Sequence, residues 1–148
     1  MPLSLVRSTG ALVLLLSLSG LAQGCSDDDS DTATDDTASS VKIADRALVS
    51  TEVSGHDLVE GSTIQVSTED DSLTVIAGCN TMSAAYTYED GKLAWSAEPA
   101  TTMMACDPAL MDQDQWLSEL FTEGVEVSGS GSDVVMTQGD VSITLTDA

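Results

Sequence analysis

Val141-Ser142-Ile143-Thr144-Leu145-Thr146 predicts the fold most clearly, because apolar and hydroxyl side chains alternate along it. Successive side chains of a β-strand point to opposite faces, so this alternation predicts a strand with one buried and one solvated face. A second run of β-type residues, 134–138, lies just upstream, and Gly139-Asp140 between the two runs favours a tight turn. The C-terminal part therefore predicts an antiparallel pair of strands.

Similar short runs continue upstream to about residue 44. Asp90-Gly91 is a strong two-residue hairpin signal between two of them. The aromatic content is only 3%, so a core must be built mainly from aliphatic residues and Met. Together with the C-terminal pair, the runs predict strands over residues 47–53, 62–68, 73–77, 84–88 and 92–97.

One segment departs from the β pattern and predicts a helix. Asp107-Pro108 is typical of an N-cap followed by proline at the first helical position, and Gly124 favours a helix end. Between them, Leu110, Leu117, Leu120 and Phe121 recur near helical spacing, which predicts a helix of about three to four turns. We therefore expect a mostly β (α+β) domain: an antiparallel, barrel-like sheet of seven or eight strands with one helix, since closure or cover protects strand edges.

The N-terminal segment has the features of an export signal. Arg7 is its one basic residue, and the apolar run 11–18 is too short to span a bilayer as a helix. The run ends in Gly20-Leu21-Ala22-Gln23-Gly24-Cys25, which resembles a bacterial lipobox, although Ala22 stands where leucine is usual. We expect residues 1–24 to be a lipoprotein signal peptide and Cys25 to be the lipid anchor on the outer side of the cell membrane. The alternative is ordinary cleavage that leaves Cys25 unmodified.

Residues 25–44 predict an acidic, disordered linker. Asp recurs through residues 26–40, which contain no large apolar side chain to offset the entropy cost of ordering. A calcium site is the alternative, but the loop lacks the glycine and distal glutamate of a known calcium motif. The chain has 4 Lys+Arg against 25 Asp+Glu, a net charge of −21. Removal of the signal peptide 1–24 takes away Arg7 and no acidic residue, which leaves a net charge near −22. Such a charge argues strongly against nucleic-acid binding.

Cys79 and Cys106 remain once Cys25 is assigned to the anchor. In an exported protein, an even pair of cysteines predicts a disulfide. In the chain-entropy model, closing this loop stabilises the fold by about 3–4 kcal/mol. The bond would join the loop after the third strand to the start of the helix.

Two segments give a family resemblance. Gly78-Cys79-Asn80-Thr81-Met82-Ser83 and Thr101-Thr102-Met103-Met104-Ala105-Cys106, with Tyr86 and Asp90-Gly91-Lys92-Leu93 between them, resemble the META domain of HslJ-like envelope lipoproteins. The matching motif residues are Gly78, Cys79, Asn80, Ser83, Thr102, Met103, Met104 and Cys106.

The resemblance implies a small envelope-facing β domain over residues 45–148. The family is often lipid-anchored, is linked to stress and antibiotic tolerance, and has no established biochemical activity. Ala84 replaces the usual glycine after Ser83, and the tryptophan common in the first strand of the family is missing. These departures concern the subfamily more than the fold.

Within these motifs, Asn80 and the methionines allow sharper hypotheses. Asn80 is a candidate ligand-binding residue, but we favour a backbone role, since Asn suits tight turns. Met82, Met103 and Met104 lie near the cysteines in sequence and could suit Cu(I), which prefers soft sulfur ligands. We favour the simpler interpretation that the methionines fill an irregular core, because an oxidised cysteine pair is not a metal ligand.

Catalysis has weak support in the sequence. His56, the only histidine, lies between Gly55 and Asp57 with no nucleophile motif nearby. Gly129-Ser130-Gly131-Ser132 lacks the pattern of a nucleophile elbow, and a catalytic carboxylate pair is possible but unmarked. Trp95 and Trp116 suit packing better than ligand stacking. We expect no enzyme activity, no catalytic residues, no metal and no cofactor.

The leading hypothesis is a monomeric, lipid-anchored envelope protein whose META domain is an interaction or stress-tolerance module. Its partners would be the membrane, through Cys25, and an unknown envelope protein or small ligand. The alternative is a carrier for a small ligand or a soft metal such as copper, using the barrel interior or the Met and Cys cluster. A hydrolase that depends on His56 is a third possibility.

Overall fold

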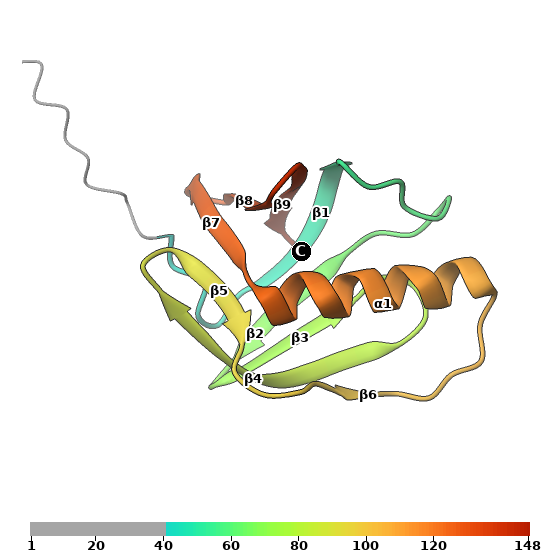
Figure 1. Ribbon diagram of the computed structural model, residues 1–148. Helices are drawn as coiled ribbons and strands as arrows, with labels where there is room; N and C mark the ends of the chain where they lie inside the picture. Colours follow the sequence, from blue (N-terminus) through green and yellow to red (C-terminus); the bar gives the residue numbers. More distant parts are fainter. Residues whose placement is uncertain (1–40) are drawn as a thin grey trace, which may run out of the picture. The chain divides into compact units, whose positions relative to one another are not determined.

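The computed structural model describes residues 41–148 of the chain. The expected signal peptide, the anchor Cys25 and most of the acidic linker lie outside these residues. Within them, nine strands and one helix follow one another along the chain (Figure 1). Their bounds are β1 (Ala47–Ser54), β2 (Gln65–Glu69), β3 (Ser72–Ile76), β4 (Thr81–Glu89), β5 (Lys92–Trp95), β6 (Ala100–Thr101), α1 (Pro108–Glu123), β7 (Val125–Ser130), β8 (Asp133–Gln138) and β9 (Val141–Asp147).

Eight of the strands close into an antiparallel barrel. The order is β3-β2-β1-β9-β8-β7-β5-β4, and pairing between β3 and β4 completes the ring. The two-residue strand β6 adds to β4 outside this ring, through the pairs Met82↔Thr101 and Ser83↔Ala100. The expected mostly β barrel with one helix is therefore confirmed.

The barrel interior is filled by aliphatic side chains, as the alternating pattern requires. In β9, Ile143 and Leu145 are fully buried, whereas Ser142, Thr144 and Thr146 between and beside them are only partly so. The residues of the core are Val41, Ile43, Leu48, Ile64, Val66, Leu73, Val75, Ala77, Met82, Leu93, Trp95, Leu117, Leu120, Phe121, Val125, Val127, Val134, Met136, Ile143 and Leu145.

The Asp90-Gly91 turn between β4 and β5 follows the sequence prediction closely. Both residues have positive φ, 51° for Asp90 and 79° for Gly91. This combination is typical of the type I′ turn, whose twist matches that of the flanking strands. The turn sets the register in which Glu89 pairs with Lys92.

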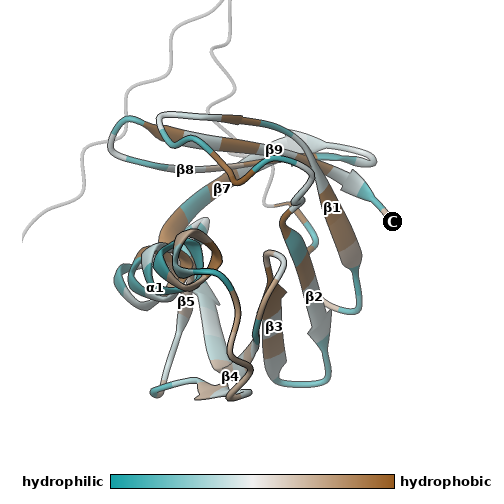
Figure 2. Cartoon of the chain, turned by 90° about the vertical axis from the view of Figure 1, so that its right-hand side faces the viewer, coloured by the Kyte–Doolittle hydropathy of each residue, from teal (hydrophilic) through white to brown (hydrophobic). Residues whose placement is uncertain are grey.

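Helix α1 lies at the seam between β5 and β7, the neighbouring strands of the barrel that share the fewest residue pairs. These pairs are Lys92↔Glu126 and Leu93↔Val125. Figure 2 views the helix almost end-on, beside β5. Its buried apolar residues are Leu117, Leu120 and Phe121. They cover the seam and complete the core.

Both ends of α1 fall where the sequence placed them. The helix starts at Pro108 after Asp107 and stops at Gly124, whose φ is +91°. That φ favours glycine, and a Cβ there would also lie 3.0 Å from Cβ of Ala94 and 3.2 Å from the Leu93 carbonyl oxygen on β5. The cap prediction needs one correction, because the Asp107 side chain makes no capping hydrogen bond. At sixteen residues the helix has about 4.4 turns, slightly more than expected.

Several strand boundaries differ from the predictions. The second strand begins at Gln65 rather than residue 62, because the Ser62 amide bonds to Val59 O and the Ile64 amide bonds to Oγ of Ser50. Strand β4 begins three residues earlier than expected, at Thr81.

The folded part also starts earlier than residue 45. Val41 and Ile43, which we had assigned to the end of the linker, are 7% and 3% exposed and belong to the core. Among residues 41–148, no helix is both long and apolar enough to cross a membrane.

Candidate functional site

The two cysteine-containing motif segments of the sequence meet at one end of the barrel, where a disulfide joins them. Cys79 follows β3 and Cys106 precedes α1, and their Cα atoms are 6.2 Å apart across the bond. The structure thus contains the disulfide that the even cysteine pair predicted. The bond fixes the irregular segment 102–107 against the loop between β3 and β4.

Asn80 is the centre of a buried hydrogen-bond network at this end. Its Oδ1 accepts hydrogen bonds from Oγ1 of Thr102 (3.1 Å) and the backbone amide of Met104 (2.8 Å). Its Nδ2 and its backbone amide both donate to Oδ2 of Asp114, at 2.9 and 3.0 Å. The side chain is 3% exposed. Asn80 therefore links both motif segments to α1.

The other motif residues support the same junction. Thr102 Oγ1 accepts a hydrogen bond from the backbone amide of Thr81 at 3.0 Å. Ser83 lies on β4, where its hydroxyl bonds to Thr74 at 2.9 Å and to Ser72 at 3.0 Å. Gly78 has φ of +116°, and a Cβ there would lie 3.2 Å from Cδ2 of Leu110. These residues shape and hold the loops.

Two polar residues of α1 that the sequence analysis left off the buried face are buried. Gln113 accepts a hydrogen bond from the Val59 amide at 2.7 Å and donates to Oγ of Ser62 and to the Ala77 carbonyl. Asp114 Oδ2 binds Asn80, while its buried Oδ1 has no hydrogen-bond partner within residues 41–148. Nothing in the 3.6-residue apolar pattern signals them, because their partners are loop groups far away in sequence.

The methionines near the disulfide separate into two kinds. Met82 is buried, in agreement with the expected core role. That interpretation is wrong for Met103 and Met104, which are 97% and 59% exposed; Met111 of α1 is 42% exposed. The Met104 amide is held by Oδ1 of Asn80, and the side chains of all three residues face solvent.

The exposed methionines border a hollow of about 340 Å³. We name this region the methionine surface; its residues are Asn80, Thr101, Thr102, Met103, Met104, Ala105 and Met111. Met111 Sδ lies 3.8 Å from Sγ of Cys79 and 3.7 Å from Nδ2 of Asn80. The surface is thus built directly on the disulfide and the Asn80 network.

Acidic residues flank the methionine surface in the sequence. Glu98, Asp107 and Asp112 are exposed, and no Lys or Arg follows Lys92. The three basic residues of the described part, Lys42, Arg46 and Lys92, lie on other elements. The segments that form or adjoin the methionine surface therefore carry exposed carboxylates and no basic residue.

His56, the candidate catalytic histidine, packs against the helix. Its ring stacks on Trp116 with centroids 3.6 Å apart and an interplanar angle of 3°. Trp95 is buried and donates from Nε1 to the Leu73 carbonyl at 3.1 Å. Ser130 and Gly131 lie at the turn between β7 and β8, away from any strand-to-helix junction.

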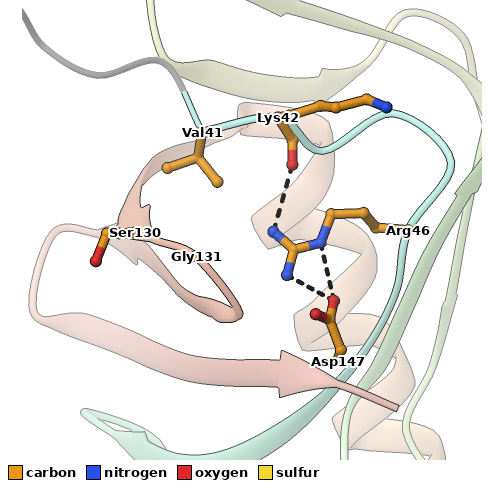
Figure 3. Close-up of a pocket in the computed structure, with 7 residues that line it drawn as sticks. Val41, Lys42, Arg46, Ser130, Gly131 and Asp147 are labelled. Atoms are coloured by element: carbon orange, nitrogen blue, oxygen red, sulfur yellow. Dashed lines mark hydrogen bonds and ion pairs between the residues drawn. The ribbon is translucent and has the colours of Figure 1, made fainter.

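A second hollow, of about 460 Å³, lies where the described chain begins (Figure 3). The Arg46 guanidinium at its edge donates to Asp147 Oδ1 from Nε (3.0 Å) and from a terminal nitrogen (2.6 Å). It also donates to the carbonyl of Lys42, at 3.3 Å, and to that of Ser132, at 3.1 Å. The donors of Arg46 are committed to the fold, so this hollow is a weaker candidate for binding an anion.

Comparisons with known proteins agree with this architecture. An NMR structure of a protein from Burkholderia xenovorans matches with a TM-score of 0.58 and 17% identity over 72% of this chain and 83% of the other. A second NMR structure matches with a TM-score of 0.55 and 20% identity over 70% of this chain and 90% of the other. Both likenesses concern the fold alone. No match was found among curated proteins.

The two cysteine segments, the closed barrel and the single helix are joined at one end of the domain by the disulfide and by Asn80. The family model of the META domain matches residues 41–148, the whole of this folded part. The chain belongs to the META domain family.

Proposed function

We propose that this protein is a bacterial envelope lipoprotein, tethered through lipidated Cys25, whose META domain binds another envelope component. The methionine surface is the binding site, and the module contributes to stress tolerance rather than catalysing a reaction. One observation carries the proposal: three large apolar side chains are exposed together beside a disulfide and a buried hydrogen-bond network.

Exposure and rigidity together favour a binding role. Burying Met103 and Met104 would remove apolar area from water, so a partner that covers them gains free energy. The Met104 amide is anchored on Asn80, which limits the ordering cost of the loop on binding. Methionine side chains also adapt to partners of different shape.

An extracytoplasmic location fits the same features. The Cys79–Cys106 disulfide is of the kind that persists in oxidising compartments. The apolar run 11–18 followed by Gly24-Cys25 supplies an export signal and a site for acylation. Mass spectrometry of the native protein tests this directly: we expect an N-terminal peptide that starts at an acylated Cys25. A lipid-free N-terminus would contradict the tether.

A binding role also accounts better than catalysis for the polar residues. The His56 ring is stacked on Trp116, which orients it for packing. The Asp114 carboxylate receives two hydrogen bonds from Asn80 and so serves the loop. A hydrolase that uses His56 would lose its activity in His56→Ala, whereas we expect that variant to keep the stress phenotype of the wild type.

A carrier for a soft metal or small ligand is the second candidate. The proximity of Met111 Sδ to the disulfide, and the hollow beside it, favour this reading. However, both neighbouring cysteines are oxidised, so the remaining soft donors are thioethers. Core side chains fill the barrel interior, which leaves the surface hollow as the place for a ligand.

Site-specific photo-crosslinking in intact cells tests the proposed surface. A photo-crosslinking amino acid in place of Met103 should give a discrete adduct, and the same residue in place of Thr87 on β4 should not. Adding Met104→Gln and Met111→Gln should abolish the adduct at position 103. Equal adducts at both positions, or none at Met103 under any stress, would contradict the proposed surface.

A further inference from the structure

We infer that the methionine surface recognises a basic amphipathic polypeptide segment, in which Lys or Arg side chains flank a few large apolar ones. This inference rests on the proposed function and specifies the partner. It combines three observations: the exposed methionines, the exposed acidic residues near them in the sequence and the hydrogen bond that holds the Met104 amide.

The apolar part of the partner follows from the shape of the surface. Met103 and Met104 come from the loop before α1, and Met111 comes from the first turns of α1. The hollow among them, about 340 Å³, is at the small end of the range of about 300–1,000 Å³ typical of ligand pockets. Such a volume suits a few inserted side chains of a larger partner. Apolar anchors that fill a pocket are the usual hot spots of an interface.

The basic part of the partner follows from the charges. Asp107 and Asp112 are exposed on the segments that carry the methionines, and Glu98 is exposed in the preceding β5–β6 loop. The described basic residues lie on β5 and before β1. A second copy of this acidic chain would bring like charges together, which opposes self-association at this surface. Phosphate-bearing ligands and anionic lipids are disfavoured for the same reason. Lys and Arg instead complement the surface and accelerate encounter.

The probe for this inference is an amphipathic Leu–Lys peptide of about five helical turns, or about 18 residues. The full chain is held in nanodiscs of zwitterionic lipid, and empty nanodiscs correct for peptide that binds lipid. We expect the peptide to bind the protein at least about tenfold more tightly than a Leu–Glu peptide of the same length and pattern.

Two matched triple variants separate apolar contact from sulfur chemistry. Met103→Gln, Met104→Gln and Met111→Gln together should weaken binding of the Leu–Lys peptide by about tenfold or more. Met103→Leu, Met104→Leu and Met111→Leu together keep the apolar area and should bind the peptide within about twofold of wild type. Binding of Cu(I) to the wild type but not to the Leu triple variant, without peptide binding, would overturn the inference in favour of a soft-metal site.

A charge variant tests the acidic contribution. Asp112→Asn should weaken binding of the Leu–Lys peptide by a few-fold, mainly because association becomes slower. Added salt should abolish this difference between variant and wild type, because it screens the charges. Asp133→Asn, at the start of β8, removes the same charge from an exposed residue outside the methionine surface and should leave binding unchanged. Equal losses in the two variants would show non-specific attraction to an acidic protein and would overturn the inference.

The combined outcomes distinguish failure of this inference from failure of the proposed function. An adduct at Met103 in cells, combined with no preference for the Leu–Lys peptide, would keep the binding surface and reject a basic partner. Concentration-dependent dimers that the Gln triple variant abolishes would reject it in favour of a second copy. Loss of both the adduct and the peptide preference would reject the inference and the proposed function together.

Discussion

The disulfide end of the barrel and the Arg46 end are built in opposite ways. At the disulfide end, a covalent bond and the buried Asn80–Asp114 network hold irregular loops, and those loops expose methionines. At the Arg46 end, one ion pair and two bonds to backbone carbonyls join the segment before β1, the β7–β8 turn and β9, and the residues around them are mostly polar.

The difference shows what each end has to do. Sheet pairing already holds the strands around Arg46, so a partly exposed ion pair is sufficient there. Segment 102–107 has no regular secondary structure of its own, and its shape depends on Asn80 and the disulfide. Such support holds the loop that carries exposed apolar side chains. A preorganised loop lowers the entropy cost of binding a partner, whereas apolar area without a partner stays in contact with water. The following substitutions test this contrast, from the largest expected effect to the smallest.

Removing the disulfide should have the largest effect. The double variant Cys79→Ala and Cys106→Ala should lower the free energy of unfolding by about 3–4 kcal/mol, because the unfolded chain regains the entropy of an open loop. Urea unfolding of wild type and variant measures this. A loss below about 1 kcal/mol would mean that hydrogen bonds alone hold this end.

Asn80→Ala should cost about 1–3 kcal/mol, because the Met104 amide and Oγ1 of Thr102 lose the side-chain oxygen of Asn80, and Oδ2 of Asp114 keeps only the backbone amide of residue 80 as a donor. The same urea measurement applies, together with hydrogen exchange at the Met104 amide, which should become much faster. Thr87→Ala on the exposed face of β4 is a matched control with little expected change. Unchanged exchange at Met104 would contradict the role of Asn80 as the support of this loop.

Arg46→Ala should cost less, about 1 kcal/mol, since Asp147 is largely exposed and solvent screens the pair. The loss should shrink with added salt, which unfolding at two ionic strengths would reveal. An effect as large as that of Asn80→Ala would remove the contrast between the two ends.

The smallest effect on stability should come from Met103→Gln, which alters a side chain that is 97% exposed. We expect a change within about 0.5 kcal/mol. The same variant should weaken peptide binding, so function and stability would separate at this residue. A clear loss of stability would show that Met103 packs in solution.

The sequence predicted the elements whose information is local. Asp90-Gly91 carries its own turn geometry, Pro108 and Gly124 delimit α1, and β9 alternates along its length. The strand β7, Val125–Ser130, was not delimited, because its second half ends in Gly129 and Ser130 and shows little alternation. Val41 and Ile43 escaped notice because they follow a long polar stretch and are buried by the tertiary fold.

The candidate site was predictable only in part. An even cysteine pair predicts a bond between Cys79 and Cys106, and that bond is present in the structure. Burial of Gln113 and Asp114 depends on loop groups such as Val59 and Asn80, which no periodicity reveals. The Met104 backbone is likewise placed by a long-range bond, to Asn80. Met103 and Met104 are exposed, so their apolar residue type suggested a core role that the structure does not support.

The pairing of β1 with β9 has a consequence for how the molecule forms. These strands are the first and the last of the described chain, and their pairs include Leu48↔Asp147 and Ser54↔Ser142. The ring therefore cannot close during synthesis until its final strand has left the ribosome, and the closing step joins segments of maximal separation, which is slow. Such late closure is compatible with the export proposed above, which requires a chain that has not yet folded.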